Sequence, residues 1–203
     1  MFASIHAGGN LPILLDCARQ FSPLIEITSE DTVTFDIRGL GRVHGSPDQI
    51  ANEIHCRVGL PANIAIAANP DAAIYTARGI PGITVVPPGQ EAAVLGPLSL
   101  HLLGCPAAMG ELFQLWGIRT FGQFAALPPL GVAARMDEEG LRWQRLAQGV
   151  FRRQLRLVGE KASFVREMDL EDAIPQLEPL FFLLSRFLHE LCQELLTHSL
   201  ATT

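Results

Sequence analysis

The order of the secondary-structure elements predicted between residues 24 and 86 constrains the fold most strongly. The pattern of this segment indicates two strands, a helix, a strand, a second helix and a short last strand. Both helices begin at recognisable signals, because Ser46 precedes Pro47 and Asn69 precedes Pro70. Strands and helices that alternate in so short a segment predict an α+β fold, in which helices cover a sheet.

The predicted elements fall into three groups along the chain. In the first group we expect strands at Leu24–Thr28, Thr32–Ile37, Ala62–Ala67 and Ile83–Val86, and helices at Leu11–Phe21, 46–57 and 69–78. The second group consists of short helices separated by Gly and Pro, at Ala107–Trp116, Phe121–Ala126 and Glu138–Gln148. The third group is a strand at Ser163–Leu170 and a long helix with apolar positions from Ile174 to Leu195. The predicted domains are residues 1–98, 99–158 and 159–203.

Two features predict that the chain lacks a piece at each end. The strand at Thr32–Ile37 alternates apolar and polar residues, which predicts one buried and one polar face. Together with the strand before it, this strand forms an edge-like pair that needs further strands. The last helix has a broad apolar face, widened by Phe181, Phe182 and Phe187, without a second layer to cover it. We therefore expect truncation at both ends.

The composition of the chain limits the cellular compartment and the kinds of partner that we expect. The formal net charge is −6, which argues against a surface that binds nucleic acid everywhere, and Lys161 is the only lysine among 15 basic residues. The four cysteines lie tens of residues apart and form no Cys-x-x-Cys pair, so neither a disulfide framework nor a zinc site is indicated. No basic leader begins the chain, and the apolar run at Leu180–Leu184 is too short to span a bilayer. We expect a cytoplasmic protein without membrane contact.

The segment PLIEITSEDTVTFDIRGL, from Pro23 to Leu40, carries a resemblance. It resembles the palm motif of Y-family (translesion, UmuC-type) DNA polymerases, in which a strand and turn place two adjacent carboxylates beside the catalytic metals. Ser29, Asp31 and Asp36 match the motif, whereas Thr32 stands where the second carboxylate is expected.

The resemblance continues over most of the chain, through Ile64–Arg78, Val85–Leu100, Leu115–Pro128 and Leu141–Leu155. The pattern GIRTFGQFAALP and the lost carboxylate are most similar to the ImuB-type polymerase-like proteins of bacterial mutasomes. The resemblance implies an α+β chain with a partial palm of mixed β-sheet and helices, a small all-helical thumb of the helix-hairpin-helix type, and the start of an α+β little-finger domain.

The resemblance also implies Mg²⁺-dependent nucleotidyl transfer, which the residues argue against. Two magnesium ions need several anionic oxygen ligands to hold them close together. Nothing in Met1–Gln20 resembles the strand that carries the first carboxylate, and Pro70 and Asp71 stand where polymerases commonly have a lysine. Of three metal carboxylates Asp31 alone remains, so we expect no productive Mg²⁺ binding and no polymerase activity. The alternative reading of Asp31 is an ordinary turn acid.

Candidate contacts with DNA lie in the helical module. Gly117, Arg119 and Thr120 form a turn in which Thr120 is a candidate N-cap, and such a hairpin directs backbone N–H groups at a phosphate. The upstream hairpin is poorer, because Pro106 lacks an N–H group. The alternative is that Gly117 is an ordinary helix C-cap and the neighbouring apolar residues are core.

The only concentration of basic residues follows this turn. Five guanidinium groups within fifteen residues fit salt-sensitive contact with the DNA backbone. The alternative is a salt-bridged face, in which Asp137, Glu138 and Glu139 neutralise some of them. The candidate DNA-binding residues of this group are Arg142, Arg145, Arg152, Arg153 and Arg156.

These observations favour a non-catalytic polymerase-like protein of DNA repair, translesion synthesis and the SOS response. It is expected to contact the backbone of damaged or primed DNA. The family implies mutasome partners, namely a replicative-type polymerase, a RecA-like accessory protein and, for a full-length form, the sliding clamp. Two alternatives remain open: an interaction scaffold with no DNA affinity, and a fragment of an active translesion polymerase whose N-terminus is missing.

Overall fold

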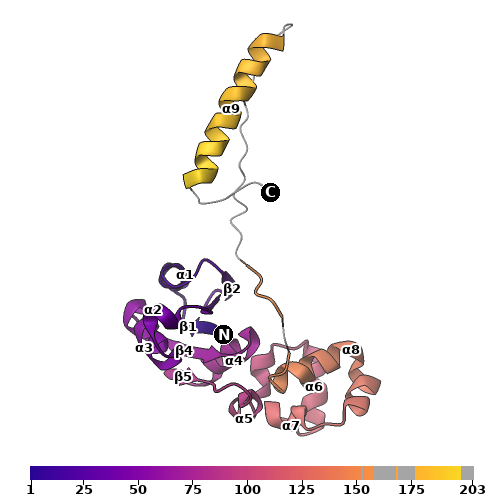
Figure 1. Cartoon of the computed structure of the whole chain (residues 1–203). Coiled ribbons are helices and arrows are strands. Elements are labelled where there is room, and N and C mark those ends of the chain that lie inside the picture. Colours follow the sequence, from indigo (N-terminus) through magenta and orange to yellow (C-terminus); the bar gives the residue numbers. More distant parts are fainter. Residues whose placement is uncertain (152, 158–167, 169–176, 198–203) are drawn as a thin grey trace. The chain divides into compact units, whose positions relative to one another are not determined.

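The computed structural model describes residues 1–151, 153–157, 168 and 177–197 (Figure 1). The chain divides into two units, Met1–Val158 and Gly159–Thr203. The predicted strand at Ser163–Leu170 lies, except for Met168, outside the described residues, and so does Arg152. No helix in the described part of the chain has the length and apolar character needed to cross a membrane.

The first unit contains a five-stranded mixed sheet. Its strands run in the order β2 (Ile25–Ser29), β3 (Thr32–Asp36), β1 (Phe2–His6), β4 (Asn63–Ala67) and β5 (Ile83–Val85). Neighbouring strands are antiparallel except β4 and β5, which are parallel. The sheet with its covering helices confirms the predicted α+β class.

Strand β1 was not predicted from the sequence, although it is the centre of the sheet. It pairs with β3 on one side and with β4 on the other, and its residues Ala3, Ser4 and Ile5 are completely buried. The strand is only five residues long, and it has Ser4 among its buried positions. The predicted lack of a partner strand next to β3 is therefore wrong, because β1 supplies it.

Helices cover both faces of this sheet. Helices α1 (Leu11–Arg19) and α3 (Pro47–Val58) pack on the apolar face, and α2 (Gly41–His44) precedes α3. Helix α4 (Pro70–Gly79) packs on β1 and β4 and shares its core with the helical module that follows. Because α4 covers the second face, all five residues of β3 are buried, so the side of this strand that was predicted to be polar is buried as well as the apolar side.

The two main helices begin where the sequence signals place them. Ser46 caps α3 in a reciprocal capping box with Gln49, and the side chain of Asn69 accepts a hydrogen bond from Ala72 N at the start of α4. Both helices have Pro in the first turn. The predicted starts at Ser46 and Asn69 are confirmed.

The helical module follows the sheet and packs around buried aromatic residues. Phe113 and Phe124 contact edge to face, with their ring centroids 4.7 Å apart, and Tyr75 of α4 contacts Phe121 in the same way at 5.3 Å. Helix α4 and the helical module therefore share a second core, distinct from the one that α1 and α3 form with the sheet. The module consists of α5 (Glu91–Leu95), the 3₁₀ helix η1 (Leu100–Leu103), α6 (Ala107–Leu115), α7 (Phe121–Ala125) and α8 (Pro129–Ala147).

Helix α8 is longer than predicted, because it begins at Pro129 and not at Glu138. Asp137 interrupts it with φ 51° and ψ −156°, so the part that was predicted begins directly after this break. In the second unit, α9 (Leu177–Thr197) is described as a single helix. Its apolar side chains include Phe181 and Phe182, which are exposed.

Candidate functional site

Five polar side chains meet at the turn between β2 and β3. Antiparallel pairing places His6 of β1 opposite Thr32, and the last turn of α4 brings Arg78 over the same turn. Neither His6 nor Arg78 was predicted as a site residue. We refer to the group as the turn cluster, which consists of His6, Ser29, Asp31, Thr32 and Arg78.

Hydrogen bonds connect every member of the turn cluster. The hydroxyls of Ser29 and Thr32 donate to Asp31 Oδ1 over 2.6 and 2.8 Å. Arg78 donates to both hydroxyls, from Nη2 to Ser29 Oγ (2.5 Å) and from Nε to Thr32 Oγ1 (3.1 Å). His6 Nδ1 lies 3.0 Å from Thr32 Oγ1. Since the Thr32 proton is used toward Asp31, we assign the proton of this contact to His6 Nδ1.

The turn cluster stabilises one negative charge. The hydrogen bond from Ser29 is the largest influence that holds the pKa of Asp31 below its ordinary value, and the bond from Thr32 and the charges of His6 and Arg78 act in the same direction. Arg78 Nη2 lies 3.9 Å from Asp31 Oδ1, so a guanidinium cation already neutralises this carboxylate.

The residues of the turn cluster do not fit a pair of magnesium ions. One carboxylate and two neutral hydroxyls provide far less negative charge than two divalent cations require. The guanidinium of Arg78 also places a positive charge where such cations would have to bind. Among the described residues, no group of three or more His, Cys, Asp or Glu side chains is placed to hold a metal ion.

Asp36, which matches the last position of the palm motif, lies at the other end of β3. Its carboxylate accepts hydrogen bonds from the backbone N and the side chain of Arg38. Burial by itself raises the pKa of Asp36, but these bonds lower it below its ordinary value. Asp36 is therefore separate from the turn cluster.

The turn at Gly117–Thr120 uses its backbone donors internally. Gly117 has φ +69° at the end of α6, and Thr120 caps α7 in a capping box with Gln123. Gln123 Oε1 accepts from the backbone N–H groups of Arg119 and Thr120, while Phe121 N donates to a carbonyl near the start of η1. No backbone N–H of this turn is left to bind a phosphate, although the side chain of Arg119 is exposed.

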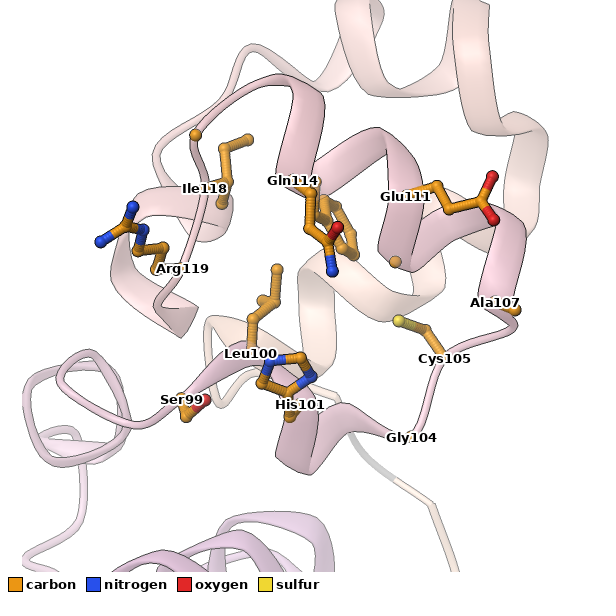
Figure 2. A pocket seen from close by; sticks show the side chains of 13 residues that line it. Ser99, Leu100, His101, Gly104, Cys105, Ala107, Glu111, Gln114, Ile118 and Arg119 are labelled. Carbon is orange, nitrogen blue, oxygen red and sulfur yellow. The ribbon is translucent and has the colours of Figure 1, made fainter.

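A cleft of about 680 Å³ lies between the two hairpins of the helical module (Figure 2). Leu100, Phe113 and Ile118 line its apolar part. In Figure 2 Arg119 and Glu111 lie on opposite sides of the opening. The cleft therefore has one cation and one anion at its edge, and not the run of cations that a phosphate backbone attracts.

The basic residues predicted as one patch separate into different environments. Arg142 and Arg145 are exposed on α8, and the guanidinium of Arg142 lies 5.7 Å from the ring centroid of Phe151. In the described part of the chain, neither of them forms an ion pair with Asp137, Glu138 or Glu139. The side chain of Arg156 is exposed as well.

Arg153 is placed differently from the other basic residues. Its guanidinium donates to Glu26 through Nη1 and Nη2, over 2.5 and 2.8 Å, and to Asp71 Oδ1 through Nε over 2.9 Å. Its side chain is only 18% exposed. Glu26 and Asp71 thus accept the hydrogen bonds of the Arg153 guanidinium, which the sequence suggested would contact DNA.

A mixed sheet of this order, with helices on both faces, has the fold of a partial polymerase palm of the DinB type. The crystal structure of a DinB family error-prone DNA polymerase from Sulfolobus solfataricus superposes with a TM-score of 0.52 at 17% identity, over 70% of this chain and 45% of that one. The post-insertion binary complex of Dbh DNA polymerase gives 0.53 at 18% identity, over 70% and 44%. These likenesses show the fold.

Relatives that are similar in sequence show the family of the chain. DNA polymerase IV of Dehalococcoides mccartyi strain CBDB1 is 32% identical over 158 residues, which cover 74% of this chain and 40% of that protein. Protein ImuB of Caulobacter vibrioides strain NA1000 is 30% identical over 128 residues, 62% of this chain and 28% of that protein. No family model matches. The chain is a Y-family polymerase-like protein related to DNA polymerase IV and to ImuB, and it spans about two fifths of the length of the DNA polymerase IV that it matches.

Proposed function

We propose that this chain is a non-catalytic Y-family polymerase-like protein that acts in DNA repair and translesion synthesis in the cytoplasm. It holds the backbone of damaged or primed DNA and does not copy it. The observation that carries the proposal is the turn cluster, in which Arg78 pairs with Asp31 and Thr32 stands where the second carboxylate is expected.

The absence of nucleotidyl transfer follows from electrostatics. In the family two Mg²⁺ ions neutralise the negative charge that develops on the transferred phosphoryl group. Here that chemistry lacks its ligands, because Asp31 is the one carboxylate of the turn cluster and its charge is already paired. We therefore propose that the chain binds no productive pair of magnesium ions.

The proposed DNA contacts are guanidinium groups of the thumb and of the segment after it. Arg119, Arg142, Arg145 and Arg156 have exposed side chains, and none of them pairs with a carboxylate in the described part of the chain. Four such contacts give weak, salt-sensitive and sequence-independent binding. Two of the solved neighbours are ternary complexes of Dbh DNA polymerase, which supports the proposal of DNA contact by the same fold.

The relationship to ImuB supports the proposed partners. We place the chain with a replicative-type polymerase and a RecA-like accessory protein in a mutasome of the SOS response, and with the sliding clamp in a full-length form. Co-purification of the chain with each candidate from the same genome tests these assignments one at a time.

Filter binding to primed DNA at two salt concentrations tests the DNA-binding proposal. The double substitution Arg142→Ala with Arg145→Ala is expected to weaken binding and to lower the magnitude of the salt slope by about two. The matched control is Arg19→Ala with Arg42→Ala, which removes the same charge from exposed positions on α1 and α2. Equal effects of the two double substitutions would contradict contact through α8.

A scaffold without DNA affinity is the alternative that the net charge of −6 favours. No binding at either salt concentration would leave this alternative alone. The 32% identity with DNA polymerase IV favours the other alternative, a fragment of an active enzyme. Templated primer extension by this chain with Mg²⁺ would support that alternative and would contradict the non-catalytic proposal.

A further inference from the structure

The segment that follows α8 contacts helix α4 and the edge strand β2. After α8 it turns at Gly149, whose φ is +70°. The side-chain amide of Asn69 donates to Gly149 O over 2.9 Å, so the N-cap residue of α4 also holds the start of this segment. A Cβ at Gly149 would lie 2.6 Å from Glu91 Cβ, so the approach requires glycine. We refer to Gly149–Phe151 and Arg153–Arg156 as the strap.

A second set of bonds holds the far end of the strap. Arg153 is bidentate to Glu26 of β2 and also donates to Asp71 in the first turn of α4. The backbone N–H of Arg156 donates to Glu26 Oε2 over 2.7 Å. Glu26 therefore accepts from the side chain of one strap residue and from the backbone of another.

The charges of this contact are largely removed from water. The side chains of Glu26 and Asp71 are 5% and 11% exposed. Burial is the main influence that raises the pKa of Asp71, and the charge of Arg153 opposes it. Although burial by itself lowers the pKa of Arg153, its bonds with Glu26 and the charge of Asp71 raise it above its ordinary value. Removal of one partner leaves an uncompensated buried charge, which is costly.

We propose that Arg153 is a positioning residue that fastens the strap to β2 and α4 through Glu26 and Asp71. We refer to the bonds of Arg153 with Glu26 and Asp71, together with the bond from Arg156 N to Glu26, as the clasp. The clasp fixes the position of the strap on the first unit, and it keeps Arg153 out of the set of residues that contact DNA. The fastening of the strap goes beyond the proposed function and does not depend on it, whereas the exclusion of Arg153 from the DNA contacts rests on the proposed function.

Amide hydrogen exchange on the wild-type chain gives the first test. The N–H of Arg156 belongs to no helix or strand, and in the clasp it is protected by its bond to Glu26. We expect slow exchange at this amide, in contrast to the exposed turn at Gly8 and Gly9. Exchange at the rate of an unstructured amide would overturn the proposal without any variant.

Two substitutions by glutamine give the second test, of which Glu26→Gln keeps the shape of the side chain and Arg153→Gln shortens it. Glu26→Gln and Arg153→Gln both open the clasp, but they change the net charge in opposite directions. Both are expected to speed exchange of the strap by at least about tenfold, while the sheet and α4 keep their protection. The matched control is Arg145→Gln, which removes the same charge from an exposed position on α8. Opposite effects of the two substitutions, no effect, or a uniform rise over the whole first unit would each contradict the clasp.

Filter binding separates the clasp from phosphate contact. If Arg153 contacted phosphate, Arg153→Gln would lower the salt slope as Arg142→Ala does, and Glu26→Gln would not. If the clasp is correct, neither substitution lowers the magnitude of the salt slope by the amount expected for the loss of one phosphate contact. A loss of about one in the slope on Arg153→Gln alone would overturn the assignment.

Discussion

Arg78 is the side chain of the turn cluster whose loss we expect to lower the free energy of unfolding most. It bonds the hydroxyls of Ser29 and Thr32 and neutralises Asp31, and its side chain is 24% exposed. Arg78→Gln is expected to lower the free energy of unfolding by about 1–3 kcal/mol, because hydrogen bonds to a charged donor are lost and a carboxylate is left unpaired. Urea unfolding measures this change.

The control for that measurement is Arg19→Gln. Arg19 forms a 3.5 Å contact with Asp16 on the exposed side of α1, where ion pairs contribute little. Equal losses for the two substitutions would contradict a special role of Arg78.

Asp31 predicts a pH dependence whose sign is fixed. Its folded-state pKa lies below its ordinary value, chiefly because Ser29 donates to it. Its contribution to stability is therefore present above the unfolded pKa and is lost as the pH falls through the lower folded value. Ser29→Ala is expected to raise the pKa of Asp31 and to destabilise the chain at neutral pH, with the difference shrinking in acid. Carbon-13 NMR of the carboxyl group and unfolding against pH measure the two effects; an unchanged pKa would contradict the assigned bond.

At the scale of elements, the cap of α7 gives a prediction that separates structure from DNA contact. Thr120 Oγ1 accepts from Gln123 N, and Thr120 N donates in turn to Gln123 Oε1. Thr120→Ala is expected to cost about 1 kcal/mol of stability, and Thr120→Ser to restore most of it. Urea unfolding measures both variants. A loss of DNA affinity in Thr120→Ala without loss of stability would contradict the capping role.

Elements with local signals were predictable, and elements defined by distant pairing were not. The starts of helices α3 and α4 were predictable because their N-caps, Ser46 and Asn69, are encoded next to the Pro in the first turn. Strand β1 is recognised only through its pairing with β3 and β4, since its three consecutive buried residues show no alternation of buried and exposed positions. The prediction began α8 directly after the non-helical residue Asp137 and missed the part of the helix before it.

The candidate site shows the same division. Asp31 and Thr32 follow from a motif in one strand and turn. His6 and Arg78 reach the turn cluster through the register of β1 and the packing of α4, which no local pattern reveals. The exposed cations of α8 and Arg153 were predicted to form one patch. Arg153 does not belong to it, because its guanidinium donates to Glu26, which is 127 residues away in sequence.

At the scale of the whole molecule, an acidic chain is proposed to bind DNA through a few arginines. With at most four phosphate contacts, the slope of log affinity against log salt is expected to lie near −0.9 for each contact, so that binding falls steeply above physiological salt. Fluorescence anisotropy of labelled primed DNA over a salt series measures this slope. A slope near zero with measurable affinity would contradict binding through the phosphate backbone.

The central claim is that the turn cluster cannot seat a pair of divalent cations, and electron paramagnetic resonance of Mn²⁺ tests it most directly. Titration of the wild-type chain and of Asp31→Asn with Mn²⁺, each with and without primed DNA and a nucleoside triphosphate, reports the bound metal. The account predicts the same Mn²⁺ binding in both proteins under every condition. Two Mn²⁺ ions bound by the wild-type chain and released by Asp31→Asn would contradict it.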